Sequence, residues 1–193
     1  MPVTPIYSFP YPALTDPPNG AAQIQALAEA VETEIDSLDA SQSATVATLA
    51  NPARAQMRAS VATSVPNSTF TAIAFDLEDY DSAAGHSTSV NNSRYTSQVA
   101  GKYYITGGVG FSATVTGNKF LEWRVNGVAV GAGLNSYPAQ TTNTSSFEAR
   151  PMYVELAVGD YVQLFVQQLS GVTVSTSAGN SYMAVLLVRN NAL

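Results

Sequence analysis

The chain has 193 residues, no cysteine and one histidine, and only 11% of its residues are charged. Without cysteine it can form no disulfide, cysteine-based zinc site or thiol nucleophile, and one histidine excludes a histidine-rich metal site within one chain. The net charge of −6 comes entirely from residues 1–53, which hold six acids and no lysine or arginine, so the clustered cations that nucleic acid binding requires are missing.

Residues 1–18 are predicted to form an extended arm rich in proline. Six of the ten prolines lie here, and each fixes its own φ and disfavours a helical conformation in the residue before it. The prolines lower the entropic cost of ordering the segment on a partner, so we favour a docking arm over a floppy tail. The side chains expected to dock on another protein are Ile6, Tyr7, Phe9 and Tyr11.

Residues 19–53 are predicted to form an amphipathic helix that ends in a hinge at Asn51-Pro52. Its apolar residues recur every three or four positions, separated mostly by Gln, Glu and Asp. A lone helix of this kind is marginal in water, so it must lie on the rest of its own chain or pair with copies of itself. The heptad spacing of Ile24, Val31 and Leu38 favours self-association as a short coiled coil. The predicted seam consists of Ile24, Leu27, Val31, Ile35 and Leu38.

Residues 54–193 are predicted to form an antiparallel sandwich. The period of the apolar residues falls from 3.6 to 2, and Asn126-Gly127 between two apolar runs is a strong hairpin signal. Short strands with no helix among them are typical of a β-sandwich. The expected strands are 59–65, 70–75, 102–111, 120–125, 128–131, 153–156, 161–168, 172–175 and 182–189.

Two motifs in this body are more specific than the strand pattern. The first is Ala-Gly-Lys-Tyr at 100–103, and the second is Leu-Ala-Val-Gly-Asp-Tyr-Val-Gln-Leu at 156–164. We expect Gly101 and Gly159 to permit tight turns and Asp160 to cap the backbone of its turn. In this order, the motifs resemble those of the complement first-component q-subunit (C1q) head and the tumour-necrosis-factor (TNF) superfamily. The resemblance covers residues 58–189, although the last strand lacks the family's usual Phe-x-Gly.

That resemblance implies a jelly roll that assembles as a homotrimer, because members of the family pack aromatic and aliphatic residues around a threefold axis. The N-terminal segments 11–20 and 25–32 also resemble the N-termini of structural proteins of actinobacterial bacteriophages. In those proteins such a segment often precedes a variable β-rich head. The expected fold class is therefore mainly β, with a jelly-roll sandwich preceded by an extended arm and one amphipathic helix, assembled as a homotrimer.

The expected function is that of a non-enzymatic bacteriophage virion protein on the particle surface. Residues 1–18 would attach to another capsid or tail protein, residues 19–53 would trimerise, and residues 54–193 would be displayed as a head. It would serve as capsid decoration, head fibre or short tail fibre; the alternative is a lectin-like tail adhesin that recognises a host surface glycan. We expect no cofactor, no nucleic acid partner and no membrane insertion, because no apolar run approaches the roughly 20 residues that span a bilayer.

A dense acidic cluster at 76–81 is the one candidate for metal binding, because oxygen ligands at close spacing suit calcium. It lacks the glycine and the distal glutamate of an EF-hand loop, so a solvated turn in which Asp76 caps backbone groups is the favoured alternative. The candidate calcium ligands are Asp76, Glu78, Asp79 and Asp81.

The remaining candidates for chemistry are one histidine and a few aromatic residues. His86 is expected in an exposed loop without a base partner, which argues against a hydrolase with a Ser-His-Asp triad. Trp123 shares a strand face with Leu121 and is expected in the core or on a threefold axis. The alternative is a sugar-stacking platform, for which the loop aromatics Tyr137 and Tyr182 are further candidates.

Overall fold

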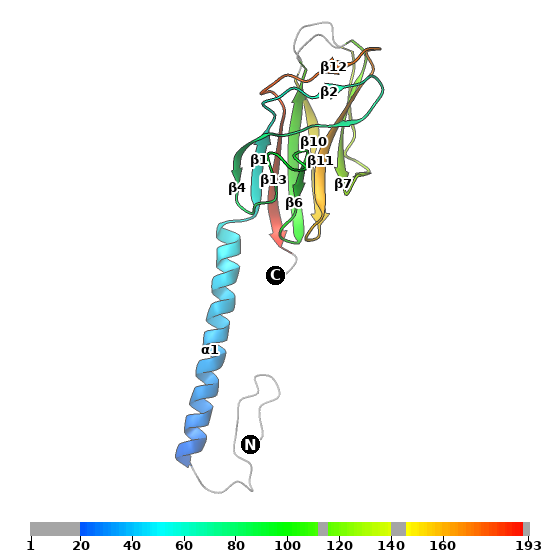
Figure 1. Cartoon of the computed structure of the whole chain (residues 1–193). Helices are drawn as coiled ribbons and strands as arrows, with labels where there is room; N and C mark the ends of the chain where they lie inside the picture. The colour runs from blue at the N-terminus through cyan, green and yellow to red at the C-terminus, as the bar shows by residue number, and fades with distance from the viewer. Residues whose placement is uncertain (1–19, 112–115, 140–145, 191–193) are drawn as a thin grey trace. The chain divides into compact units, whose positions relative to one another are not determined.

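The computed structural model describes residues 20–111, 116–139 and 146–190, without the side chains of residues 48–50. The predicted arm and its four docking side chains therefore lie outside the described residues. The chain divides into two compact units with the boundary between Ala50 and Asn51. The first contains helix α1 (Gly20–Ala50), which confirms the predicted helix, and the second is an all-β head (Figure 1).

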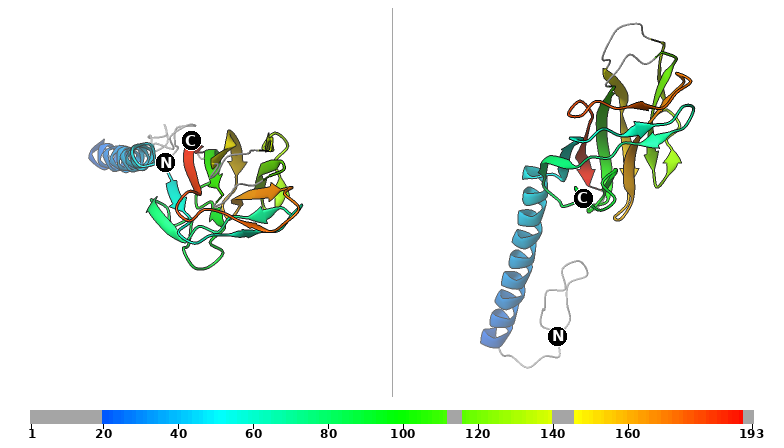
Figure 2. Two further views of the ribbon diagram at one scale, coloured as in Figure 1. Left: turned by 90° about the horizontal axis from the view of Figure 1, so that it is seen from above. Right: turned by 45° about the horizontal axis from the view of Figure 1, so that its top comes forward.

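The head consists of two main antiparallel sheets packed face to face (Figure 2). The strand order is β10-β6-β13-β1-β4 in the five-stranded sheet and β3-β11-β7-β8 in the six-stranded sheet, where β5 also pairs with β11 and β9 with β7. A third pair, β12-β2, lies at the upper end of the head in Figure 1. The described strands are β1 (Arg54–Arg58), β2 (Ser64–Val65), β3 (Thr71–Ala72), β4 (Leu77–Asp81), β5 (Arg94–Thr96), β6 (Gly101–Gly110), β7 (Lys119–Val125), β8 (Val128–Ala129), β9 (Asn135–Tyr137), β10 (Ser146–Leu156), β11 (Tyr161–Gln168), β12 (Val174–Ser175) and β13 (Tyr182–Asn190).

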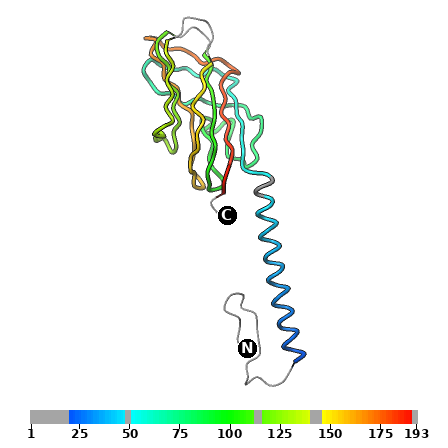
Figure 3. Tube along the Cα trace, turned by 180° about the vertical axis from the view of Figure 1, so that it is seen from behind, coloured from blue at the N-terminus to red at the C-terminus, as the bar shows by residue number. Residues whose placement is uncertain are grey.

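Strand β13 occupies the centre of the five-stranded sheet although it lacks the Phe-x-Gly of the resembled family. It pairs with β6 on one side and β1 on the other, and in Figure 3 its red trace runs between their green and cyan traces. Its register with β6 shifts between Leu187 and Arg189. The family motif is thus not needed for the pairing of the last strand.

The long predicted strands are confirmed, and the early ones are partly wrong. β6, β7, β11 and β13 agree with the expected ranges to within one residue at each end. The expected strand 59–65 is replaced by β1 before it and β2 at its end. The acidic segment expected as a turn forms β4, while β5 and β9 were not predicted.

The core lies between the two sheets and follows from the alternation of side chains along each strand. In β11 the side chains of Val162, Leu164 and Val166 are fully buried, while those between them are half-buried. Trp123 on β7 is also fully buried, and its Nε1 donates a hydrogen bond to the carbonyl oxygen of Arg150 at 2.8 Å. The core position expected for Trp123 is confirmed, and a sugar-stacking role is wrong because no part of the ring reaches the surface.

The two motif glycines, Gly101 and Gly159, are required for different structural reasons. Gly159 has φ +89°, which is the turn conformation that the sequence predicts. Gly101 needs no positive φ; it begins β6 where a Cβ atom would overlap the carbonyl oxygen of Arg189. The predicted tight turn at Gly101 is therefore wrong, and the glycine is required by the close approach of β13.

Replacing Gly101 by alanine should destabilise the head by roughly 1–3 kcal/mol, because the added methyl group forces β6 and β13 apart. Gly131→Ala is the matched control, since a Cβ atom there would meet nothing within 4 Å. Thermal unfolding followed by circular dichroism should show a lower Tm for Gly101→Ala alone. Equal Tm values for the two variants would contradict this account of the motif.

The turn before β11 should make the stability of the head depend on pH. The pKa of Asp160 is lowered because its carboxylate accepts hydrogen bonds from the Asn126 side chain at 2.8 Å and from the N–H of Ala157 at 2.7 Å. The unfolded chain therefore binds more protons, so this contribution is present above about pH 4 and is lost as the pH falls through the folded-state pKa.

Asn126→Gly removes the side-chain amide that donates to the Asp160 carboxylate. Glycine tolerates the φ of +51° observed at this position. Urea unfolding between about pH 5 and pH 2.5 should show a shallower loss of stability in this variant than in the unmodified chain. An unchanged slope would show that Asn126 does not lower the pKa of Asp160.

Candidate functional site

The outer face of the five-stranded sheet, which points away from the core, carries a row of large apolar side chains. Tyr104 on β6 lies opposite Leu186 on β13 and Tyr153 on β10, and Leu186 in turn lies opposite Arg54 on β1. The rings of Tyr104 and Tyr153 are 5.4 Å apart between centroids. Tyr153 is 57% exposed and Leu186 is 40% exposed. An antiparallel sheet with one solvated face ordinarily carries polar residues there, so this row needs an explanation.

The row extends onto the edge strand β4. The guanidinium of Arg54 lies 5.8 Å from the ring centroid of Tyr80, which is 47% exposed. Arg54, Tyr80, Tyr104 and Leu186 together line a pocket of about 290 Å³. We name this surface the tyrosine face and define it by Arg54, Tyr80, Tyr104, Tyr153 and Leu186.

Polar contacts occupy the other end of the same sheet. The carboxylate of Asp79 accepts hydrogen bonds from Gln56 at 2.7 Å and from Nε of Arg58 at 2.8 Å. The hydroxyl of Tyr182 donates to Glu148 at 2.7 Å. These groups already satisfy one another, so the tyrosine face is the part of this sheet that burial against a partner would stabilise most.

Helix α1 carries the predicted seam, and four of its five side chains are exposed on the single chain, whereas that of Val31 is half-buried. Ile24 is 71%, Ile35 is 52% and Leu38 is 56% exposed. Besides the heptad spacing, the stripe contains an 11-residue repeat: Ile24, Ile35 and Val46 form one series, and Leu27 and Leu38 form another. An 11-residue repeat corresponds to 3.67 residues per turn and favours a slight right-handed supercoil, whereas the heptad spacing favours a left-handed one.

The structure does not bring the four candidate calcium ligands to one point. Asp76 accepts hydrogen bonds from the backbone N–H and the hydroxyl of Ser60, which lowers its pKa, and Asp79 is bound by Arg58. Asp81 accepts the backbone N–H groups of Ala83 at 3.0 Å and His86 at 2.8 Å. Among the described residues there is no group of three or more acids or histidines placed to hold a metal ion. The predicted capping role of Asp76 is confirmed, although it precedes a strand and not a turn.

His86 differs from the expectation of an exposed histidine without a partner. Its side chain is fully buried, with Nδ1 at 2.8 Å from Oε1 of Glu78 and Nε2 at 3.2 Å from the carbonyl oxygen of Asn92. A register shift in the β1–β4 pairing places Glu78 opposite Met57 of the core, which explains why this acid meets the histidine. Because both ring nitrogens have backbone or carboxylate partners, no serine hydroxyl stands in the position of a triad nucleophile.

The other proposed sugar-stacking residues also have partners. The hydroxyl of Tyr137 donates to the carbonyl oxygen of Glu148 at 2.5 Å, and Tyr182 donates to the carboxylate of the same residue. The predictions from sequence missed the tyrosine face. The sequence pair Tyr103-Tyr104 could have predicted it. Two consecutive tyrosines in one strand place an aromatic ring on each face of the sheet, which indicates that both faces are buried.

No family model and no curated protein sequence matches the chain. In the part of the chain that the structure describes, no helix has the length and hydropathy needed to cross a membrane.

Solved structures do match. The globular domain of the zebrafish complement 1qA protein aligns with a TM-score of 0.54 and 11% identity, covering 73% of this chain and 100% of that domain. Crystal structures of murine APRIL at pH 8.5 and pH 5.0 each align with a TM-score of 0.52 and 11% identity, covering 70% of this chain and 98% of theirs. The fold that the two sequence motifs predict is confirmed: the head is a C1q/TNF-like jelly roll.

Proposed function

We propose that this chain is a structural protein of a bacteriophage virion, displayed on the particle surface as a homotrimer and attached through residues 1–18. It serves as capsid decoration, head fibre or short tail fibre and is not an enzyme. The observation that carries the proposal is that, among the described residues, two apolar surfaces are exposed, the tyrosine face on the head and the seam on α1.

The tyrosine face supports assembly of the head through copies of itself. Apolar area removed from water stabilises an interface by roughly 25 cal/mol per Å², and paired aromatic rings add to this. Tyr104 and Tyr153 lie beside each other on neighbouring strands, so three copies can place these rings around a common axis. The resemblance of the head to C1q and TNF jelly rolls implies the same arrangement.

The helix supports the same assembly independently. An isolated helix gains most of its stability from packing of its apolar side, and α1 has 31 residues with an apolar stripe that Gln42 interrupts. Its rise of 1.5 Å per residue gives a length of about 46 Å, long enough for a trimeric stalk. Both surfaces belong to one chain, so the proposed homotrimer has an apolar surface to cover in each of the two units.

The attachment role rests on the N-terminal segment. Its prolines and aromatic residues fit an arm that is ordered on another virion protein at low entropic cost. Its resemblance to N-termini of actinobacterial phage structural proteins supports this location. A receptor-binding tail adhesin is the second candidate, and the observation that favours it is a polar pocket of about 250 Å³ in the head.

The purified chain should have three times its chain mass of 20.2 kDa in light scattering at micromolar concentration. Leu27→Asp combined with Val31→Asp should weaken the trimer at least tenfold, because it places charges in the seam. Thr33→Asp combined with Ala40→Asp adds the same charge on the opposite side of the helix, at 100° per residue, and should leave the mass unchanged.

Tyr153→Asp tests the tyrosine face in the same way, with Val128→Asp as control, because Val128 is 70% exposed on β8 of the other sheet. The variant at Tyr153 should dissociate at concentrations where the control stays trimeric. A monomer mass for the unmodified chain would disprove the assembly.

Deleting residues 1–18 should give a folded trimer that no longer enters particles, because the arm supplies attachment and not folding. Antibody raised against residues 54–193 should label intact particles in immunogold electron microscopy. Label over the capsid would favour decoration or a head fibre, and label at the tail tip would favour the adhesin. Absence of label, or normal incorporation of the shortened chain, would contradict the proposal.

A further inference from the structure

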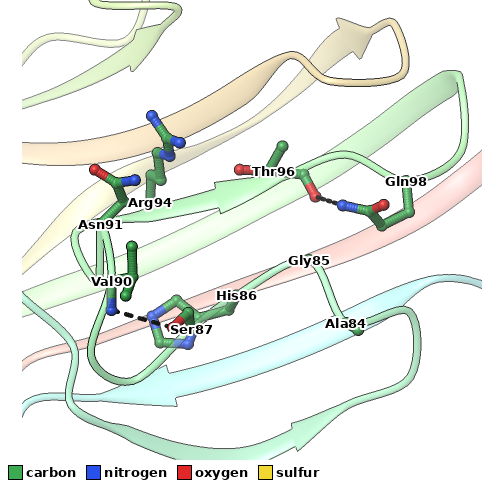
Figure 4. A pocket seen from close by; sticks show the side chains of 9 residues that line it. All are labelled: Ala84, Gly85, His86, Ser87, Val90, Asn91, Arg94, Thr96 and Gln98. Carbon is green, nitrogen blue, oxygen red and sulfur yellow. Dashed lines mark hydrogen bonds between the residues drawn. The ribbon is translucent and has the colours of Figure 1, made fainter.

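A pocket of about 250 Å³ opens beside β5, between this strand and the segment that connects it to β4. Arg94 and Thr96 come from β5, Gln98 follows it, and Ser87 and Asn91 come from the connecting segment (Figure 4). The volume lies just below the roughly 300–1,000 Å³ of pockets for drug-sized ligands, so the pocket suits one ring-sized molecule.

The connecting segment is held in one conformation by hydrogen bonds along its length. The carboxylate of Asp81 accepts two of its backbone N–H groups, and the buried His86 ring spans from Glu78 to the carbonyl oxygen of Asn92. The carbonyl oxygen of Gly85 accepts the N–H of Thr96 at 2.7 Å. The pocket wall is therefore ordered before any ligand arrives, which reduces the entropic cost of binding.

Backbone strain and close packing mark the same segment. Ala84 has φ +52°, a left-handed conformation that residues with a Cβ atom adopt only when their surroundings impose it. At the neighbouring Gly85 a Cβ atom would overlap the ring of Tyr95 and the carbonyl oxygen of Thr96. The segment is thus fitted tightly against β5, and this fit fixes the pocket shape.

Arg94 supplies the positive charge of the pocket. Its guanidinium carbon lies 4.7 Å from the ring centroid of Tyr161, so a cation–π contact holds the group against this ring. Within residues 20–111, 116–139 and 146–190, no carboxylate lies within ion-pairing distance of this guanidinium. A planar cation held in this way is suited to a bidentate contact with a carboxylate.

Neutral polar groups line the rest of the pocket, and Arg94 stands at one end of it (Figure 4). The hydroxyl oxygen of Ser87 accepts the N–H of Val90 at 3.1 Å, which leaves its own O–H available to donate. The amide of Gln98 donates to the carbonyl oxygen of Thr96 at 3.2 Å, which leaves its Oε1 as an acceptor. Asn91 adds a further amide beside Arg94 (Figure 4). Donors and acceptors along one pocket with a cation at its end match a ligand with several hydroxyls and one acidic group.

We infer that this pocket binds a single sugar residue that carries a carboxylate, such as a uronic or sialic acid unit at the end of a surface glycan. The guanidinium of Arg94 binds the carboxylate, and Ser87, Asn91 and Gln98 bind the ring hydroxyls. The inference names the ligand class for the adhesin form of the proposed function and rests on that proposal for its biological role. Binding of a free sugar does not depend on where the protein sits on a particle.

The test is titration of the full-length chain with glucuronic acid, N-acetylneuraminic acid, glucose, acetate and inorganic phosphate, followed by saturation-transfer NMR and calorimetry. At least one acidic sugar should bind with a millimolar dissociation constant, and glucose should bind at least tenfold more weakly. Binding of glucose, acetate or phosphate as tight as that of the better acidic sugar would overturn the inference, as would no binding of either acidic sugar.

Arg94→Gln should weaken binding of the acidic sugar at least tenfold. Arg150→Gln is the matched control, since it removes the same charge from an exposed position on β10 of the other sheet. Asn91→Gly is a second variant. Glycine readily adopts the φ of +52° observed at this position, so the variant should weaken sugar binding without affecting the fold. Undiminished binding by Arg94→Gln would overturn the assignment of the pocket as an acidic-sugar site. The virion proposal is tested separately by the labelling of particles.

Discussion

Strand β6 carries large side chains on both of its faces, and the organisation of the head depends on how both are covered. Tyr103 and Ile105 point into the core and are fully buried by the six-stranded sheet. Tyr104 points to the opposite face, where Tyr153 and Leu186 flank it on the neighbouring strands. The described strands of the head cover only the inner face of β6, and none of them forms a second layer over its outer face. The proposed assembly through that face would cover these exposed side chains.

The helix has a similar requirement, and its repeat restricts the solution. Ile24, Ile35 and Val46 are 11 residues apart, which fits a nearly straight bundle with a slight right-handed twist. The same repeat places Gln42 in line with Val31, so one layer of a trimeric stalk would contain amide groups. Polar residues at such positions fix register and the number of helices at some loss of stability. A stalk of this design would set the copies in register before their heads meet.

Periodicity predicted the elements whose stability depends on local pattern. The range of β11 and the burial of Trp123 follow from alternation, and α1 follows from its stripe. The acidic strand β4 was not predicted because its contacts are not local. Asp79 pairs with Arg58, which is distant in sequence, and Glu78 contacts His86 across a loop. Strand β10 was predicted only in part because Pro151 interrupts it. The structure accommodates that proline at an irregularity between Ala149 and Met152, on a strand at the edge of its sheet.

The proposed trimer assembly and the proposed sugar binding are compatible because they use strands of different sheets. The tyrosine face belongs to the five-stranded sheet, whereas Arg94 lies on β5, which pairs with β11 of the six-stranded sheet. A homotrimer built on the tyrosine face would bury the first sheet and leave β5 open to solvent. Three copies of the Arg94 pocket would then be presented together, so that weak binding of one sugar unit becomes multivalent binding to a glycan-coated surface. On the proposed function, millimolar affinity at each pocket would then be sufficient for attachment.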